Sequence, residues 1–272
     1  MKKIAFFDID GTLTSEVDGL VPMSAAYAIR RARENGHLMF INTGRCFREV
    51  GENIRSIGFD GYVCGCGTNI LCGGKDALYI PQTHETTMKI LRKAREAGVD
   101  ILFESRRAIC FDLSRPLKHP DALRHCVKLR ERGCEMSEVL ESPDFFCDKF
   151  VVWYEDPWQL EKLRETSDAL FECVDRGGNF REFVPLGCSK ATGIRFVLQY
   201  YGMDLASAYA FGDSSNDLSM LTYVPGSVAM GNASPASLFD HVSYVTQNAS
   251  RDGILLALEH FGFFTPASDK TE

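Results

Sequence analysis

Residues 4–13 read IAFFDIDGTL, a compact apolar run that ends in two aspartates and a glycine. This pattern predicts a buried parallel strand that delivers its carboxyl end to a loop. Asp8 and Asp10 are two positions apart, so both carboxylates project to one face if the strand pleat continues through them. Gly11 then allows the chain to turn sharply.

Single strands and single helices alternate along most of the chain, with one interruption. The alternation predicts a parallel sheet. From about His84 to Leu186, helical segments alternate instead with pairs of strands, which indicates a separate inserted domain. We therefore expect an α/β fold with a Rossmann-like, doubly wound parallel core formed by residues 1–82 and 188–272. The inserted α/β cap domain is expected over residues 83–187.

Three local expectations follow from the same patterns. A helix is expected over about residues 46–57, and another between the strand that ends at Met230 and a strand near Tyr244. Apolar runs on either side of Gly73-Gly74 predict a hairpin.

A second group of acidic residues is expected at the same edge of the sheet. Asp213 follows a further predicted strand, and Asn216 and Asp217 begin the next helix. Ligands bind at the carboxyl ends of the strands in open α/β sheets, so both acidic groups should face one site. At ~4 Å and an effective dielectric of ~20, each like-charged pair costs about 4 kcal/mol, so the cluster should hold protons or bind a cation. Oxygen ligands favour Mg²⁺.

Groups that suit an anion are predicted beside these carboxylates. Thr43 and Gly44 follow the second strand and offer a hydroxyl and a backbone amide that can approach an anion closely. Lys190 lies at the start of a later helix, where the helix dipole also favours anions. A cation and donors opposite a metal-bound carboxylate suit a phosphoryl group.

The ordered set of motifs resembles the haloacid dehalogenase (HAD) superfamily, and within it the Cof-type phosphatases that carry a large α/β (type IIB) cap. The resemblance covers nearly the whole chain, with the cap matching in pattern only. Two further segments look like the family's C-terminal signature. The matching stretches are Asp8-Ile9-Asp10-Gly11-Thr12-Leu13, Thr43-Gly44-Arg45, Lys190, Gly212-Asp213-Ser214-Ser215-Asn216-Asp217, Met230-Gly231-Asn232-Ala233 and Asp252-Gly253.

The resemblance implies a role for each acidic residue. Asp8 would be the nucleophile that forms an aspartyl-phosphate. Asp10 would be the general acid and base, and its backbone carbonyl would bind Mg²⁺. Asp8 and Asp213 would complete the protein's share of the metal ligands. Asp217 would orient Lys190 or metal-bound water.

The resemblance also implies that Thr43, Gly44, Lys190 and Asn216 bind the substrate phosphate. The chain departs from the family pattern where Asn42 replaces a common alanine and Ala191 a common glycine, and Cys66-Gly67-Thr68 stands where relatives often read Asn-Gly-Ala. The roles of Arg45 and Cys66 are left open.

Composition narrows the class of partner. The chain has 37 acidic and 30 basic residues and a net charge of −7, which argues against a nucleic-acid backbone as partner. No stretch approaches ~18 uninterrupted apolar residues, so no membrane association is expected. Ten scattered cysteines without a Cys-x-x-Cys motif indicate reduced thiols and a cytoplasmic protein. A monomer or small homo-oligomer is expected.

The expected activity is Mg²⁺-dependent hydrolysis of small phosphate monoesters, with a sugar phosphate or a phosphorylated cofactor as substrate. Two alternatives stay open on the motifs alone. One is a phosphosugar mutase, which passes the phosphoryl group to a sugar instead of water. The other is a non-catalytic sensor that binds a phosphorylated ligand.

Overall fold

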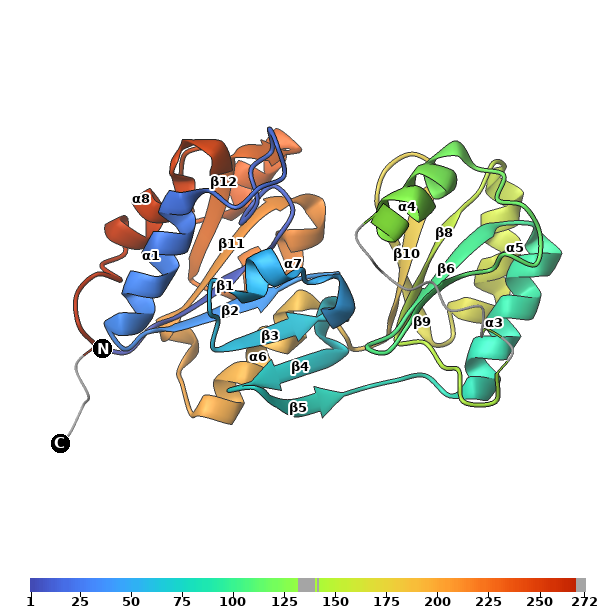
Figure 1. Cartoon of the computed structure of the whole chain (residues 1–272), viewed down its shortest axis with the longest axis horizontal. Coiled ribbons are helices and arrows are strands. Elements are labelled where there is room, and N and C mark those ends of the chain that lie inside the picture. Colours follow the sequence, from blue (N-terminus) through green and yellow to red (C-terminus); the bar gives the residue numbers. More distant parts are fainter. Residues whose placement is uncertain (132–139, 141, 268–272) are drawn as a thin grey trace. The chain divides into compact units, whose positions relative to one another are not determined.

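The computed structural model describes residues 1–131, 140 and 142–267. The chain divides into two compact units (Figure 1). We call residues 1–44, 50–78 and 189–272 the core unit, and residues 45–49 and 79–188 the cap unit. Residues 45–49, which the sequence places in the core, group with the cap unit through their contacts. Residues 132–139, 141 and 268–272, which the expected domains include, lie outside the described residues.

An eight-stranded sheet forms the centre of the core unit, in the order β13-β12-β11-β1-β2-β3-β4-β5. Neighbouring strands from β13 to β3 are parallel, and β4 runs antiparallel to β3. Gly73 and Gly74, with φ of +56° and +76°, turn the chain between β4 and β5, which confirms the predicted hairpin. The strands are β1 (Ile4–Phe7), β2 (Leu38–Asn42), β3 (Gly61–Cys64), β4 (Asn69–Cys72), β5 (Lys75–Tyr79), β11 (Ala208–Ser214), β12 (Gly226–Ser234) and β13 (Tyr244–Val245).

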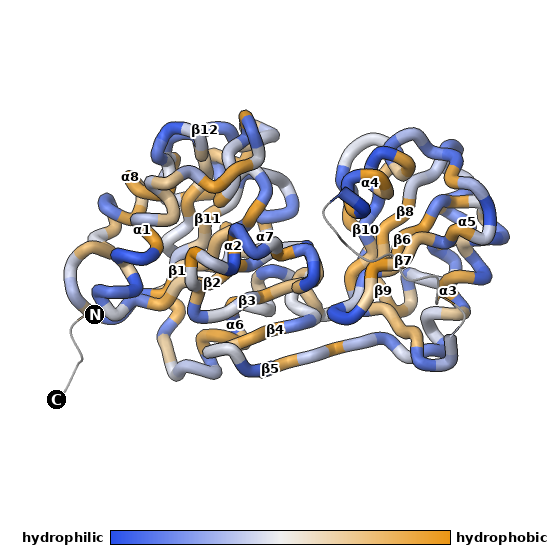
Figure 2. Tube along the Cα trace, in the orientation of Figure 1, coloured by the Kyte–Doolittle hydropathy of each residue, from blue (hydrophilic) through white to orange (hydrophobic). Residues whose placement is uncertain are grey.

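Helices cover both faces of this sheet. Apolar side chains of β1 and β2 pack with α6 and α7 in one buried cluster, and α1 and α8 contact each other and the sheet. Hydrophobic residues run along the central strands β1 and β11 of the core unit (Figure 2). The doubly wound α/β core is thereby confirmed. The helices are α1 (Met23–Glu34), α2 (Glu52–Arg55), α6 (Lys190–Tyr201), α7 (Leu218–Tyr223) and α8 (Gly253–His260), with 3-10 turns at Gly65–Gly67, Leu205–Ser207, Ser215–Asp217, Ala236–His241 and Ala249–Arg251.

Two expected helices are wrong. The helix expected over residues 46–57 is instead a 3-10 turn, Phe47–Glu49, followed by the short α2. Gly51 separates the two because its backbone is extended, with φ −62° and ψ 159°. The segment between β12 and β13 is a 3-10 turn in which Leu238 is the only buried residue, so it lacks the apolar stripe that would hold an α-helix against the sheet.

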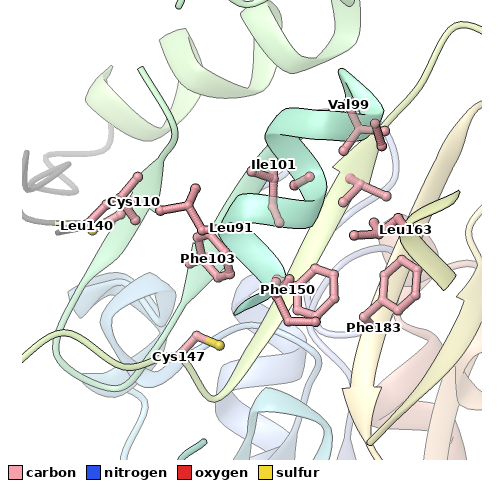
Figure 3. Close-up of a cluster of buried hydrophobic side chains, with 14 of the residues drawn as sticks. Leu91, Val99, Ile101, Phe103, Cys110, Leu140, Cys147, Phe150, Leu163 and Phe183 are labelled. Atoms are coloured by element: carbon pink, nitrogen blue, oxygen red, sulfur yellow. The ribbon is translucent and has the colours of Figure 1, made fainter. Parts of the chain in front are cut away.

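The cap unit is a five-stranded antiparallel sheet in the order β7-β6-β8-β10-β9. Helices α3 and α5 pack on one face and α4 on the other. Phe150 of β8 anchors the first face, because its ring stacks on Phe183 with centroids 4.6 Å apart (Figure 3). The elements are α3 (His84–Ala97), β6 (Asp100–Glu104), β7 (Ile109–Phe111), α4 (Pro120–Glu131), β8 (Lys149–Trp153), α5 (Pro157–Ser167), β9 (Phe171–Asp175) and β10 (Phe180–Pro185).

No helix in the described part of the chain is both long enough and apolar enough to cross a membrane.

Candidate active site

Asp8 follows the central strand of the core sheet. Strand β1 is fully buried between β11 and β2, and both neighbours run parallel to it. The Asp8 backbone N–H donates to the Phe211 carbonyl at 3.1 Å, which continues the pairing of β1 with β11. Because these strands end side by side, Asp8 and Asp213 emerge at the same edge of the sheet.

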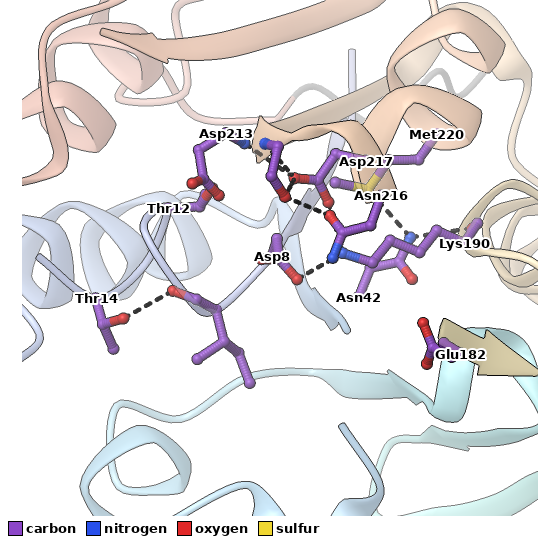
Figure 4. Close-up of polar contacts among 12 residues, drawn as sticks. Asp8, Thr12, Thr14, Asn42, Glu182, Lys190, Asp213, Asn216, Asp217 and Met220 are labelled. Carbon is purple, nitrogen blue, oxygen red and sulfur yellow. Dashed lines mark hydrogen bonds and ion pairs between the residues drawn. The ribbon is translucent and has the colours of Figure 1, made fainter. Parts of the chain in front are cut away.

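Lys190 lies between two carboxylates. Its Nζ is 2.6 Å from Asp8 Oδ1 and 2.5 Å from Asp217 Oδ1 (Figure 4). Ser189 begins α6 as a capping-box residue with Thr192, which fixes where Lys190 enters the site. All three charged side chains are buried. Burial alone would lower the pKa of Lys190, but the carboxylates of Asp217 and Asp8 raise it above its ordinary value, so the lysine is charged.

Burial and the charge of Lys190 shift the pKa of Asp8 in opposite directions. Burial raises its pKa to about 6, while the charge of Lys190 pulls the pKa down. The carboxylate of Asp217 acts in the same direction as burial. The charge of Lys190 therefore favours the ionised form of Asp8.

Asp217 is held by the last two residues of β11. Its Oδ2 accepts hydrogen bonds from the backbone N–H groups of Asp213 and Ser214, at 2.9 and 3.1 Å. Gly212 permits this arrangement, because a Cβ at that position would lie 2.5 Å from the Asp217 Cβ. Both oxygens of Asp217 are thus engaged within the site.

Asp213 packs directly against the loop after β1. The Thr12 hydroxyl donates to Asp213 Oδ1 at 3.0 Å. Gly11 has φ +77°, and a Cβ there would lie 2.3 Å from Asp213 Oδ2, so only glycine fits. Burial, together with the charges of Asp217 and Asp8, raises the pKa of Asp213 to about 7.

Carboxylate oxygens of Asp8, Asp213 and Asp217 all lie within 4.8 Å of one another. Three acids around one lysine leave excess negative charge in a mostly buried space, which a divalent cation would neutralise. The donor set contains only oxygen, the chemistry that Mg²⁺ prefers. These residues therefore fit a magnesium ion. The Asp10 side chain is exposed at the start of the next loop, and its expected metal contact is its backbone carbonyl.

The expected phosphate-binding residues Thr43, Gly44 and Asn216 follow β2 and β11, the two strands that pair with β1. Thr43 follows β2, which pairs with β1, and its backbone N–H donates to the Val63 carbonyl at 2.9 Å. Gly44 comes next in the chain. Asn216 lies in the 3-10 turn after β11, where its Oδ1 accepts a 2.6 Å hydrogen bond from the hydroxyl of Ser214, the last residue of β11.

Two residues to which the sequence patterns assign no role contact the site. Thr12 belongs to the first motif, and its hydroxyl contacts Asp213. Asn42 Nδ2 donates to the Lys190 carbonyl at 3.0 Å, and its Oδ1 has no hydrogen-bond partner in the described part of the chain. The signal was an asparagine at the end of an otherwise apolar buried strand.

Cys66 and Arg45, whose roles the sequence leaves open, belong to different units. Cys66 is buried with φ +55°, and its N–H donates to the Thr43 carbonyl at 3.1 Å. This contact supports the backbone of Thr43. Arg45 belongs to the cap unit, where its Nη1 donates to the Glu49 carbonyl at 3.2 Å.

Comparisons with known proteins find relatives in sequence and in fold. The chain is 28% identical to YkrA of Bacillus subtilis over 264 residues, which is 96% of this chain and 98% of that protein. It is 25% identical to the HMP-PP phosphatase of Serratia proteamaculans over 250 residues, 86% of each chain. The solved structure of the HAD subclass IIB sugar phosphatase BT4131 shares the fold, with a TM-score of 0.78, 24% identity and coverage of 96% of this chain and all of that one.

A family model that describes haloacid dehalogenase-like hydrolases matches residues 5–258, from the second residue of β1 into α8. The match includes all the other strands of the core sheet and the residues of the cap unit. The chain therefore belongs to the haloacid dehalogenase-like hydrolase family.

Proposed function

We propose that this enzyme is a Mg²⁺-dependent phosphatase that hydrolyses small phosphate monoesters through an aspartyl-phosphate at Asp8. The observation that carries the proposal is the contact of Lys190 with Asp8 beside Asp213. It combines an ionised carboxylate at a strand end, a buried cation and excess acid that suits a metal ion. Phosphoryl transfer needs in-line positioning and charge neutralisation, which this combination supplies.

Asp8 attacks phosphorus, forming a bond between its carboxylate oxygen and the phosphoryl group while the ester oxygen leaves. Asp10 gives its proton to that oxygen, so the leaving group departs as an alcohol. Asp10 then takes a proton from water, which attacks the aspartyl-phosphate and restores Asp8. The exposed position of the Asp10 side chain suits a group that exchanges protons with substrate and water.

Thr43, Gly44, Lys190 and Asn216 would hold the transferring phosphate. Asp8 and Asp213 side chains, with the backbone carbonyl of Asp10, would hold the metal ion, while Asp217 orients Lys190. When bound, Mg²⁺ supplies positive charge that offsets the negative charge of the phosphoryl group during transfer.

Similar proteins support the proposed substrate class. One relative is an HMP-PP phosphatase and a structural neighbour is a sugar phosphatase. We therefore propose a small phosphorylated metabolite, either a sugar phosphate or a phosphorylated cofactor. None of the nine cysteines in the described part of the chain forms a disulfide bond, which supports a reducing, cytoplasmic location.

A panel of phosphate monoesters, assayed with wild type and Asp8→Asn in parallel, tests the proposal. We expect wild type with Mg²⁺ to release inorganic phosphate from at least one ester, and Asp8→Asn to release none while remaining folded. Equal release by both proteins would contradict the nucleophile assignment. Isomerised hexose phosphate in place of free phosphate would identify a mutase, and binding of an ester without turnover would identify a sensor.

A further inference from the structure

The C-terminal signature has no part in the proposed chemistry, yet it contacts the loop that carries Asp8 and Asp10. Asn232 lies near the end of β12, and its Nδ2 donates to the Gly11 carbonyl at 2.7 Å. The residues are 221 positions apart in the chain. We infer that Asn232 is a positioning residue that keeps this loop in the shape required for Mg²⁺ binding. The inference rests on the magnesium site of the proposed function.

The Asn232 amide is fixed at both ends. Its Oδ1 accepts a hydrogen bond from the Ala249 backbone N–H at 2.9 Å, while Nδ2 reaches Gly11. An amide with one donor contact and one acceptor contact has a defined orientation. Asn232 therefore links the loop at residue 249 to the loop at residue 11.

Residues 8–16, which we call the catalytic loop, meet Asp213 at Gly11. Gly11 has a positive φ and lies close to the Asp213 carboxylate, so a residue with a side chain would be strained at this position. The Gly11 carbonyl belongs to the peptide unit that enters Thr12, whose hydroxyl contacts Asp213. Holding this carbonyl therefore fixes the peptide plane between the Asp10 backbone and the Thr12 hydroxyl.

The glycines of the signature explain how Asn232 is supported. A Cβ on Gly231 would lie 2.7 Å from Asn248 Oδ1 and 2.9 Å from the Asn248 nitrogen. A Cβ on Gly253 would lie 2.2 Å from the Gln247 carbonyl oxygen. Both glycines thus let the backbone of residues 247–248 pack closely between β12 and α8. The two signature segments, residues 230–233 and 252–253, therefore pack around the same backbone and hold Asn232 in place.

A second contact ties the far end of the catalytic loop to the same support. The Glu16 carboxylate accepts hydrogen bonds from the Ser250 hydroxyl at 2.5 Å, the Ser250 N–H at 3.1 Å and Asn248 Nδ2 at 3.2 Å. The loop is thereby held at Gly11 and at Glu16. Glu16 is exposed, so its contact should contribute less than that of Asn232.

The test compares Asn232→Ala and Glu16→Ala with wild type. Asn35→Ala is the matched control, since Asn35 also donates from its side chain to a distant backbone carbonyl, that of Phe263, but lies before β2 at the other edge of the sheet. Mg²⁺ affinity is measured by calorimetry without substrate. Hydrogen exchange of the Thr12, Leu13 and Thr14 amides is measured in the metal-free protein. These amides donate to carbonyls within the loop, so they report its order.

We expect Asn232→Ala to weaken Mg²⁺ binding by about 10–100-fold, the range for residues that support metal ligands. Its loop amides should exchange about tenfold faster. Glu16→Ala should weaken Mg²⁺ binding roughly threefold, and Asn35→Ala should change neither quantity. A purely structural role would lower the thermal midpoint without changing Mg²⁺ affinity.

Unchanged Mg²⁺ affinity and unchanged exchange in folded Asn232→Ala would overturn the inference. If that variant does not fold, Glu16→Ala decides in the same way. A wild-type protein that binds no Mg²⁺ would refute the proposed function instead. The hydrogen exchange of the loop amides in the metal-free protein would then test by itself whether Asn232 positions the loop.

Discussion

Lys190 Nζ lies 2.6 Å from Asp8 Oδ1 in an almost fully buried pair. The same nitrogen contacts Asp217, so one cation serves two buried carboxylates. Breaking a buried ion pair by removing one partner costs much more than its formation contributes, because an uncompensated charge remains. Lys190 is therefore required for stability as well as for the proposed phosphate contact.

Replacement of Lys190 should show both effects. We expect Lys190→Met to lower the free energy of unfolding by about 3–5 kcal/mol, since Asp8 and Asp217 lose their counter-charge. Phosphatase activity should fall at least about 10²–10³-fold, as when one donor to a developing charge is removed. Urea unfolding and steady-state assays measure the two. A variant with wild-type stability would show that the carboxylates do not depend on this lysine.

A trapping experiment should distinguish the role of Asp10 from that of Asp8. The substrate is an ester whose leaving group needs no proton, so Asp10→Asn can still transfer the phosphoryl group to Asp8. The rate at which this variant hydrolyses the aspartyl-phosphate should fall about 10²–10⁴-fold. We expect intact mass spectrometry to find a phosphorylated form of Asp10→Asn. The double variant with Asp8→Asn should carry no phosphate. A phosphoryl group in the double variant would place the nucleophile elsewhere.

Mg²⁺ should stabilise the folded chain through Asp213. A ligand that binds only the native state at 100 times its dissociation constant adds about 2.7 kcal/mol. We expect added Mg²⁺ to raise the thermal midpoint of wild type and to have little effect on Asp213→Asn. Asp240→Asn, an exposed residue of the core unit, is the control and should respond like wild type. An equal response of Asp213→Asn and wild type would remove Asp213 from the metal site.

The arrangement of the core could be predicted because its strands are short buried apolar runs. β1 and β11 have apolar side chains on both faces, and such runs with helices between them favour a parallel sheet. The helix expected over residues 46–57 failed for a local reason. Apolar residues continue across Gly51, but the extended backbone of that glycine ends any helix there. The spacing of apolar residues does not reveal a change of backbone direction at a single residue.

The residues at the strand ends could also be expected to meet, since the carboxyl ends of parallel strands share one edge of the sheet. Side-chain pairings between distant segments could not. Thr12 and Asp213 are 201 positions apart, and Asn42 and Lys190 are 148 apart. Each pairing depends on how helices and loops seat on the sheet, which the spacing of residues along the chain does not determine.

Within the cap unit, Asp148 should give stability a distinctive pH dependence. The Tyr79 hydroxyl donates to its Oδ1 at 2.7 Å and the Arg106 N–H to its Oδ2 at 2.8 Å. Burial nevertheless raises the pKa of Asp148 to about 6. In the unfolded chain an aspartate titrates near pH 3.9, so between about pH 4 and 6 the native state binds more protons.

Stability from this group must therefore fall as pH rises through that window, by up to about 1.4 kcal/mol per pH unit. Asp148→Asn does not titrate, so the thermal midpoint of this variant should fall less between pH 4 and 6 than that of wild type. Asp112→Asn is the control. Burial opposes ionisation of Asp112, but hydrogen bonds that include those from Arg95 outweigh it and lower its pKa. Its contribution is lost only as pH falls below about 4, so Asp112→Asn should keep the wild-type slope between pH 4 and 6. If Asp148→Asn kept that slope too, the buried carboxylate would not be the group that titrates.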